Sequence, residues 1–381
     1  MRKGKIRKIV TKYGLFFVMV SIGLMFGAIL ANDIGMRLAE SDGDLAYLGY
    51  LVIVWVSMYI GLYCHLTIHE AGHYYFGKQT GYTFVSLRIG KLMFIKENGR
   101  IVLKYFNIPG TSGQCLMLPP QPYREDFPYL LYNHGGWIFN LISAILISLI
   151  LLLVPMHYLL RTALLIQAFI AFIFAATNGI PMKSNGFPND GYNIQLLKKS
   201  ADCRKAFWMQ MQIHGVFMSG VRLRDMPPEW FQRSESADST NPLIATMDSF
   251  RCSYELDHGE TEQATLLALE LIDRPGLLEF QKHELRCVIL FSEIMAECRS
   301  GIINSLYTKP LQKFIQKTSF NPARHRLNYA LEKIYFRDEE KAKKAKKKFE
   351  KTLKTFPYRV VIKDEKNLMV RVDERAGFQK V

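Results

Sequence analysis

Residues 46–73 read AYLGYLVIVWVSMYIGLYCHLTIHEAGH, and this stretch decides the class of fold. Its first part, residues 46–68, carries no Asp, Glu, Lys or Arg. A helix needs about 20 apolar residues to cross the roughly 30 Å hydrocarbon core of a bilayer, so this run predicts a membrane span. The motif HEAGH at residues 69–73 follows without a break. Ionisable side chains at the end of a span are costly there and usually functional.

Three more charge-poor runs lie in the first half of the chain. They cover residues 14–31, 129–154 and about 160–178. A cleaved signal peptide is the alternative for residues 14–31, but its apolar core of roughly 7–15 residues is shorter than this run. Lys and Arg collect on the cytoplasmic side of membrane proteins. The basic residues before the first run therefore place the N-terminus inside the cell: Arg2, Lys3, Lys5, Arg7, Lys8 and Lys12.

The predicted fold is an α-helical multi-pass membrane protein of about four spans, with both termini in the cytoplasm of a bacterial-type plasma membrane. The acidic loop at residues 32–45 falls outside the cell, and the HEAGH motif arrives near the cytoplasmic face. The formal net charge of +15 fits cytoplasmic loops rich in Lys and Arg. No helix-turn-helix, zinc-finger or RNA-binding signature is present, so we expect no nucleic-acid partner.

A small β segment is predicted between the second and third spans, at residues 83–106. Within it, β-branched and aromatic residues stand on either side of Asn98-Gly99, which is a strong hairpin signal. We expect two or three strands. An exposed edge strand here offers a surface for strand addition by an extended peptide; a capping hairpin without that role is the equal alternative. The Gly and Pro residues within 110–122 suit a shaped loop over a site.

Residues 196–381 predict a cytosolic, mainly α-helical domain. Apolar residues recur there with the helical period. The helices form hairpins that resemble tetratricopeptide-type pairs, without a clean period of about 34 residues. Residues 327–336 and 341–356 are one expected pair, and residues 358–372 are expected to form a hairpin of strands. The lysine-rich run within the second member of that pair is interpreted as a solvated helix face, with contact to anionic lipid as the alternative.

Six cysteines are scattered along the chain without a Cys-x-x-Cys pair. This pattern predicts neither a disulfide framework nor a cysteine zinc site. Free thiols are typical of a reducing compartment, which agrees with a cytosolic second half.

The HEAGH motif has the spacing of a metal site. On a helix, residues i and i+4 share a face, so His69 and His73 can direct their imidazoles at one metal ion. Glu70 lies beside them and can reach a metal-bound water. A helix with polar residues on one face and no metal is the alternative, which the membrane context makes less favourable. A tetrahedral zinc site with one open position needs a third protein ligand.

Candidates for that third ligand must lie at the cytoplasmic end of the second span. Asp190 follows the fourth span, which returns to the same membrane face. Glu125 and Asp126, before the third span, are the fallback. The acids within residues 32–45 are on the wrong side. His65, one turn before the motif, is interpreted as a polar residue that lines the site rather than a ligand.

This order of features resembles the site-2 protease family of zinc intramembrane proteases. Three motifs carry the resemblance: Asn178–Pro181 matches the Asn-x-x-Pro of the family, Asp190–Gly191 matches its Asp-Gly, and Gly135–Asn140 is similar to its small-residue motif ending in Asn. The resemblance covers residues 14 to about 195. Two features depart from the pattern. Asn189 stands where Leu usually precedes the Asp, and the link between the first two motifs is several residues longer.

The resemblance implies that residues 1–195 are an intramembrane protease core. It implies that His69, His73 and Asp190 bind Zn²⁺ and that Glu70 is the general base. The substrate would be a membrane-inserted peptide or a single-span protein. Cleavage near the cytoplasmic face would serve either regulated intramembrane proteolysis or peptide-precursor processing.

Two asparagines on the apolar runs are candidates for substrate or oxyanion contacts. Asn140 or Asn178 could donate to a developing oxyanion, as preorganised amides do elsewhere, with packing between helices as the equal alternative. Residues 196–381 lie outside the family core and are expected to bind a cytosolic protein. The competing hypothesis is an inactive membrane adaptor or peptide-binding protein whose helical half recruits partners. The intact Glu70 argues against it.

Overall fold

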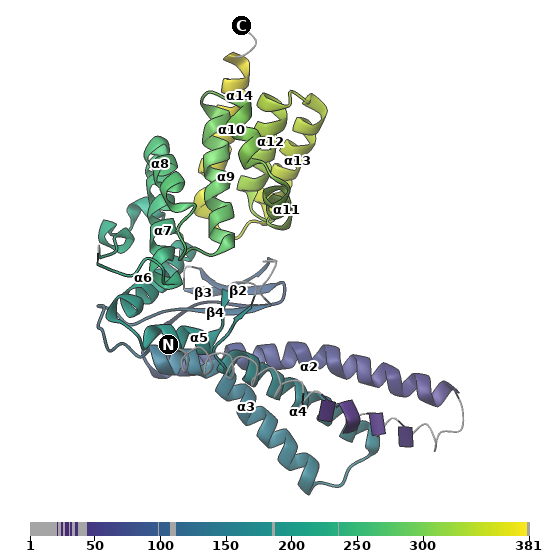
Figure 1. Cartoon of the computed structure of the whole chain (residues 1–381). Helices are drawn as coiled ribbons and strands as arrows, with labels where there is room; N and C mark the ends of the chain where they lie inside the picture. Colours follow the sequence, from purple (N-terminus) through teal and green to yellow (C-terminus); the bar gives the residue numbers. More distant parts are fainter. Residues whose placement is uncertain are drawn as a thin grey trace, which may run out of the picture. The chain divides into compact units, whose positions relative to one another are not determined.

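Figure 1 shows a computed structural model of the chain, which is mostly helical with a small antiparallel sheet. The structure describes residues 44–378 except 98, 107–111, 185–186 and 235, together with scattered residues between 21 and 36. The first expected span, residues 14–31, thus lies largely outside the described residues. The chain divides into two compact units. The membrane-helix unit holds the chain up to Ile68 and Trp137–Ala176, and the sheet-and-helix unit holds His69–Gly136 and everything from Thr177 onward.

Three described helices are long and apolar enough to cross a membrane: α2 (Asp44–Gln79), α3 (Tyr129–Leu153) and α4 (Tyr158–Gly179). This confirms the last three predicted spans in length and composition, and it is compatible with a multi-pass membrane protein. Large apolar side chains such as Trp55 and Leu152 are exposed on these helices. The helix α2 does not end with the apolar run but continues through the HEAGH motif to Gln79.

Polar contacts join α2 to α4 inside the membrane-helix unit. The hydroxyls of Tyr50 and Thr162 lie 3.2 Å apart, and the side-chain amide of Gln167 donates to the backbone oxygen of Ser57 at 2.8 Å. Hydrogen bonds of this kind add to van der Waals packing between membrane helices, where no hydrophobic force drives association.

The β segment is a four-stranded antiparallel sheet in the order β3-β2-β1-β4, made by β1 (Thr83–Ile89), β2 (Leu92–Glu97), β3 (Arg100–Tyr105) and β4 (Gly113–Leu118). The expected hairpin between β2 and β3 is confirmed: Glu97 pairs with Arg100, and Gly99 has a φ of 80°. Asn98 lies outside the described residues. The expectation of a loop within 110–122 is wrong for residues 113–118, because β4 pairs with the open side of β1 and buries Cys115, Leu116 and Met117.

The rest of the sheet-and-helix unit is a series of helices (Figure 1). A small two-stranded ribbon comes first, made by β5 (Lys183–Ser184) and β6 (Phe187–Pro188). The main helices are α5 (Asp190–Leu197), α6 (Ala201–Met218), α7 (Pro242–His258), α8 (Thr261–Leu271), α9 (Glu279–Met295), α10 (Ser300–Leu306), α11 (Lys309–Lys317), α12 (Pro322–Ala330), α13 (Glu339–Thr355) and α14 (Ile362–Phe378). Most connections are short, but the link between α6 and α7 is longer and contains two 3₁₀ turns, Leu223–Asp225 and Pro228–Phe231.

Local sequence signals set the ends of several of these helices. The side chains of Asn241 and Asn321 accept hydrogen bonds from the first turns of α7 and α12, and a proline follows each of them. Asp338 caps α13 in the same way, while Gly259 ends α7 with a φ of 91°. Such caps satisfy backbone groups that a helix terminus leaves unpaired.

The structure confirms the expected pairing of residues 327–336 with 341–356, because α12 and its continuation pack against α13. The expectation of strands at 358–372 is wrong. A short 3₁₀ turn at Arg359–Val361 leads into α14 instead. The buried residues Met369, Val372 and Ala376 of α14 recur at helical spacing, and this outweighs the β propensity of the Val-Val-Ile run.

Candidate metal centre

The motif histidines and Asp190 meet at one point in the sheet-and-helix unit. His69 and His73 lie one turn apart on α2, and their Nε2 atoms are 3.2 Å apart. The Oδ2 atom of Asp190 lies 3.3 Å from the Nε2 of His69 and 3.2 Å from that of His73. The three atoms therefore form a nearly equilateral triangle, and both histidines are buried.

This triangle has the dimensions of a tetrahedral metal site. With metal–ligand bonds of about 2.0–2.1 Å, tetrahedral zinc holds its ligand atoms roughly 3.3–3.4 Å from one another. The group His69, His73 and Asp190 could thus hold a metal ion, and three protein ligands leave one position open. The residues fit a zinc ion in number, type and spacing.

The hydrogen bonding of His73 also fits a metal ligand. Its Nδ1 lies 2.8 Å from the backbone oxygen of Tyr132, and because a carbonyl can only accept, Nδ1 is the donor. The Nε2 of the same ring faces the Asp190 carboxylate, so this hydrogen bond orients the other ring nitrogen toward the proposed metal position. A backbone partner of this kind is typical of metal-binding histidines.

Glycines make room for the histidine rings where α2 crosses α3. A Cβ atom at Gly136 would stand 2.3 Å from the Cε1 of His69. At the same crossing, a Cβ at Gly72 would lie 2.2 Å from the oxygen of Gly135, and one at Gly135 would lie 2.4 Å from the oxygen of Gly72. The two backbones are thus in direct contact. This explains why the motif beginning at Gly135 needs its glycines.

Asp190 reaches the histidines because the residue before it clamps the chain to the end of α4. The side chain of Asn189 caps α5 by accepting from the backbone N–H of Tyr192 at 2.9 Å. Its amide nitrogen donates to the backbone oxygens of Thr177 and Ile180, both at 2.6 Å. Asn in place of the usual Leu therefore has a structural role, because its side-chain oxygen accepts a hydrogen bond from α5 while its nitrogen donates to the end of α4.

The long link before Asp190 is absorbed locally. The ribbon of β5 and β6 turns the additional residues back on themselves. Gly191 then lies against the last residue of α4, since a Cβ there would stand 2.4 Å from the oxygen of Gly179. The glycine of the Asp-Gly motif thus allows the close approach that carries Asp190 to the site.

Glu70 is buried beside the histidines, with 5% of its surface exposed. Its carboxylate interacts with the backbone N–H of Cys115 on β4, and the hydroxyl of Tyr132 donates to the backbone oxygen of the same residue at 2.7 Å. The Cys115 thiol does not join the metal ligands. Burial, together with the nearby Glu70, raises its pKa well above the usual value, which keeps it a neutral thiol.

The fallback ligands lie elsewhere on the surface. The Glu125 and Asp126 side chains are 63% and 73% exposed and pair with Arg204 and Arg124, and neither belongs to the metal-binding group. Asn178 lies in the last turn of α4 and is half-buried.

The other two polar candidates belong to the membrane-helix unit. Asn140 on α3 is fully buried, and His65 is buried and hydrogen-bonds to Asn140 and Gln167. The oxyanion role of Asn140 and Asn178 and the lining role of His65 stay predictions.

Neither family models, curated proteins nor solved structures give a match to this chain. The interpretation of the site rests on its own geometry. Sequence reasoning missed Asn189, whose place before an Asp-Gly pair is a helix-cap signal, and Tyr132, for which the sequence carries no signal because its contacts come from chain folding alone.

Proposed function

We propose that the chain is an intramembrane zinc endopeptidase of the site-2 protease type. The observation that carries this proposal is the triangle of His69, His73 and Asp190, with the buried carboxylate of Glu70 next to it at the end of a helix long enough to span a bilayer. A buried carboxylate that is not needed as a ligand is costly, and proton transfer is a function that explains it.

In this proposal, the metal ion and Glu70 have separate roles in peptide hydrolysis. Bound zinc would supply Lewis-acid polarisation of the scissile carbonyl and a lowered pKa for water. Glu70 takes a proton from the attacking water and returns it to the leaving amine, as a general base and then a general acid. Its interaction with Cys115 orients the carboxylate. The candidate oxyanion donors are Asn140 and Asn178, as the sequence predicts.

The substrate would be a membrane-inserted peptide or a single-span protein, cut near the cytoplasmic face. A spanning helix holds its backbone groups in internal hydrogen bonds, so the scissile region must unwind before attack. The proposed setting is a bacterial-type plasma membrane with both termini inside, and residues 196–381 would recruit a cytosolic protein.

The test compares membranes that carry the wild type with membranes that carry Glu70→Gln. Quantitative proteomics should find uncut substrates accumulating with Glu70→Gln, while the purified variant keeps about one zinc per chain, since Glu70 is not a ligand. Glu125→Gln is the matched control, because it removes one exposed carboxylate on the same unit. Identical peptide patterns for wild type and Glu70→Gln would favour the inactive adaptor.

A further inference from the structure

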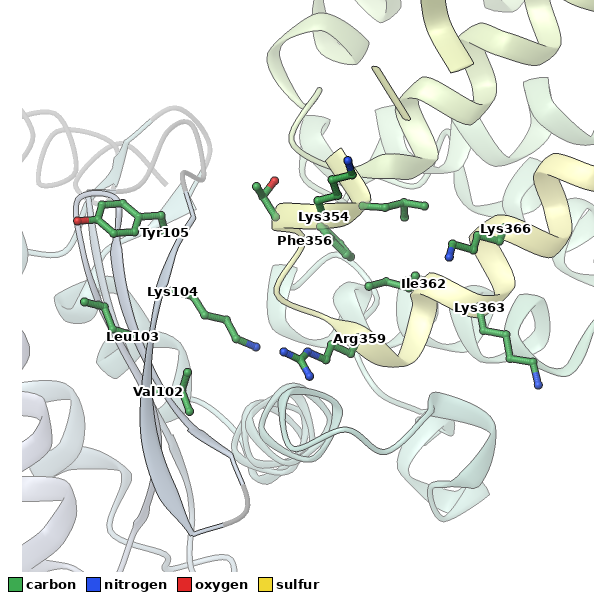
Figure 2. Close-up of a pocket in the computed structure, with 12 residues that line it drawn as sticks. Val102, Leu103, Lys104, Tyr105, Lys354, Phe356, Arg359, Ile362, Lys363 and Lys366 are labelled. Carbon is green, nitrogen blue, oxygen red and sulfur yellow. The ribbon is translucent and has the colours of Figure 1, made fainter. Parts of the chain in front are cut away.

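A groove of about 680 Å³ lies on the far side of the sheet from β4 (Figure 2). One wall is residues 102–105 of β3. The other wall is the chain from the end of α13 to the first turns of α14, including Phe356 and Ile362. The metal centre contains none of these residues.

The strand that forms one wall is an open edge. β3 is the last strand in the sheet order. The backbone N–H of Phe106 bonds to the oxygen of Lys91 at 2.8 Å, and hydrogen-bonded pairs alternate along an antiparallel ladder. The backbone groups of Ile101, Leu103 and Tyr105 therefore point away from β2. No described strand lies beyond them.

The side chains of β3 are divided by face. Ile101, Leu103 and Tyr105 lie on one face and are 66%, 49% and 70% exposed. Val102 and Lys104 lie on the other, and in Figure 2 the Lys104 side chain extends toward Arg359 while Leu103 and Tyr105 lie on the opposite side of the strand. An edge strand with exposed apolar residues tends to pair with a strand of another chain.

The opposite wall presents positive charge. Lys354, Arg359, Lys363 and Lys366 are all exposed, and no carboxylate in the described part of the chain forms an ion pair with them. Figure 2 shows Arg359 and Lys366 reaching toward the strand. Lys104 differs from them, because it is paired with Glu97.

An apolar cluster packs the two walls of the groove against each other at one end. Phe106, at the end of β3, packs edge-on against Phe320, Phe356 and Tyr358, and it is buried together with Met93 and Ile95 of β2. The ammonium of Lys104 also lies 3.4 Å from the backbone oxygen of Pro357. The groove is thus preformed, which lowers the entropic cost of binding.

We infer that this groove binds an extended, acidic segment of a partner protein that adds as a fifth strand to the free edge of β3. Side chains alternate along a strand. Every second residue of the segment would therefore be acidic and face Arg359 and Lys366, and the residues between would be apolar and extend the face of Leu103 and Tyr105. Backbone hydrogen bonds give such complexes their affinity and side chains their specificity.

Two other occupants fit the groove less well. A second copy of the chain would bring Arg100, Lys104 and the four cations of the opposite wall against identical charges. Burial of the edge in a lipid bilayer would leave the outward backbone groups of β3 unsatisfied, and open sheet edges are not found in hydrocarbon. An acidic strand satisfies the charges and the backbone together.

The experiment measures fluorescence anisotropy of a labelled peptide of about eight residues that alternates valine and glutamate, added to the full-length protein in detergent. Neither metal nor turnover is needed for this readout, so it is independent of the proposed proteolysis. We expect saturable binding that weakens as salt rises. Arg359→Glu with Lys366→Glu should weaken it by about tenfold or more. Leu103→Pro, which removes an outward N–H and blocks the edge, should weaken it by about tenfold.

The matched control reverses two exposed lysines on α13 that lie outside the groove, Lys344→Glu with Lys347→Glu, and should leave binding unchanged. Equal binding of a valine–lysine peptide, or full binding by Leu103→Pro, would overturn the inference. Dihexanoyl phosphatidylglycerol is the competing probe. If it binds in a manner that depends on Arg359 and Lys366 while the peptide does not bind, the groove is a lipid-headgroup site and the inference is wrong.

Discussion

The two edges of the small sheet differ in whether their outward backbone groups contact other parts of the chain. At the β4 edge, the backbone of Cys115 points away from β1 and is used inside the chain: Glu70 interacts with its N–H, and the hydroxyl of Tyr132 donates to its oxygen. At the β3 edge, the corresponding backbone groups meet no described strand, and their apolar side chains are exposed.

This difference indicates a division of labour within one sheet. The β4 edge is part of the framework of the candidate metal centre, because it contacts the buried carboxylate of Glu70 and also Tyr132, the hydrogen-bond partner of His73. The open β3 edge makes aggregation more favourable, and a binding role would explain why this edge is not covered. The two edges should therefore respond differently to substitution.

The largest effect is expected at the candidate metal centre beside the β4 edge. Asp190→Ala should lower bound zinc from about one per chain to nearly none, because two histidines alone leave the tetrahedral site short of a ligand. Asp190→Asn should fail as well, since a neutral amide is a poor zinc ligand. Elemental analysis of purified protein measures both.

Glu125→Ala and Asp126→Ala are the controls for Asp190. Both residues are exposed and lie outside the ligand group, so these variants should keep their zinc. Normal zinc in Asp190→Ala, with loss in either control, would transfer the third ligand to residues 125–126.

The second effect concerns the close backbone crossing of α2 and α3 beside His69. Gly135→Ala forces a methyl group into the oxygen of Gly72, and overpacking of this kind costs about 1–3 kcal/mol or more. Denaturation in mild detergent should show the loss. Gly49→Ala on α2 is the matched control, since a Cβ there meets nothing within 4 Å. Equal stability of the two variants would contradict the close crossing.

The parts of this architecture that follow from local patterns could be predicted from the sequence. Apolar runs predicted the three long apolar helices, Asn98-Gly99 predicted the hairpin, and the i, i+4 spacing predicted that His69 and His73 share a face. The strand β4 and the helix α14 were assigned wrongly. The Gly and Pro residues around β4 favoured a loop, and the β-branched residues at the start of α14 favoured a strand. In both cases, packing against residues distant in the sequence determined the structure instead.

The framework around the ligands was harder to anticipate for the same reason. Tyr132 serves His73 through a backbone oxygen, which any residue type offers. Asn189 acts through four simultaneous backbone contacts that exist only once α4 and α5 are in place. Asp190 itself was selected by membrane side and by a family resemblance, because no local spacing links it to the HEAGH motif.

The third effect separates the two functions of Asn189. Asn189→Asp keeps the oxygen that caps α5 but loses the donor to Thr177 and Ile180, whereas Asn189→Ala loses both. Loss of a residue that orients a ligand lowers metal affinity by about 10–100-fold. We expect Asn189→Asp to fall within that range and Asn189→Ala to lose about 1 kcal/mol of stability in addition. Zinc titration with a chelator competitor and thermal melting measure the two quantities.

A smaller effect is expected for Tyr132→Phe. This change removes the hydroxyl that donates to Cys115 but leaves the backbone oxygen that serves His73. One net hydrogen bond is worth about 1 kcal/mol, so stability should drop by that amount while zinc stays bound. A variant that loses its zinc would show that the hydroxyl, rather than the backbone, holds the site together.

The smallest effect is expected at the β3 edge, and it sharpens the comparison most. Leu103→Pro removes an N–H that points away from β2, and proline is tolerated where a strand's N–H faces outward. Proline also favours an extended conformation in the residue before it, and Val102 already has that conformation within β3. We expect the melting temperature to stay within about 2 °C of the wild type. Val102→Pro is the neighbouring control: the N–H of Val102 bonds within the ladder opposite Ile95, so this variant should melt well below Leu103→Pro. If the two prolines destabilise the protein equally, the outward groups of β3 are already in use, and the contrast between an occupied edge and an open one does not hold.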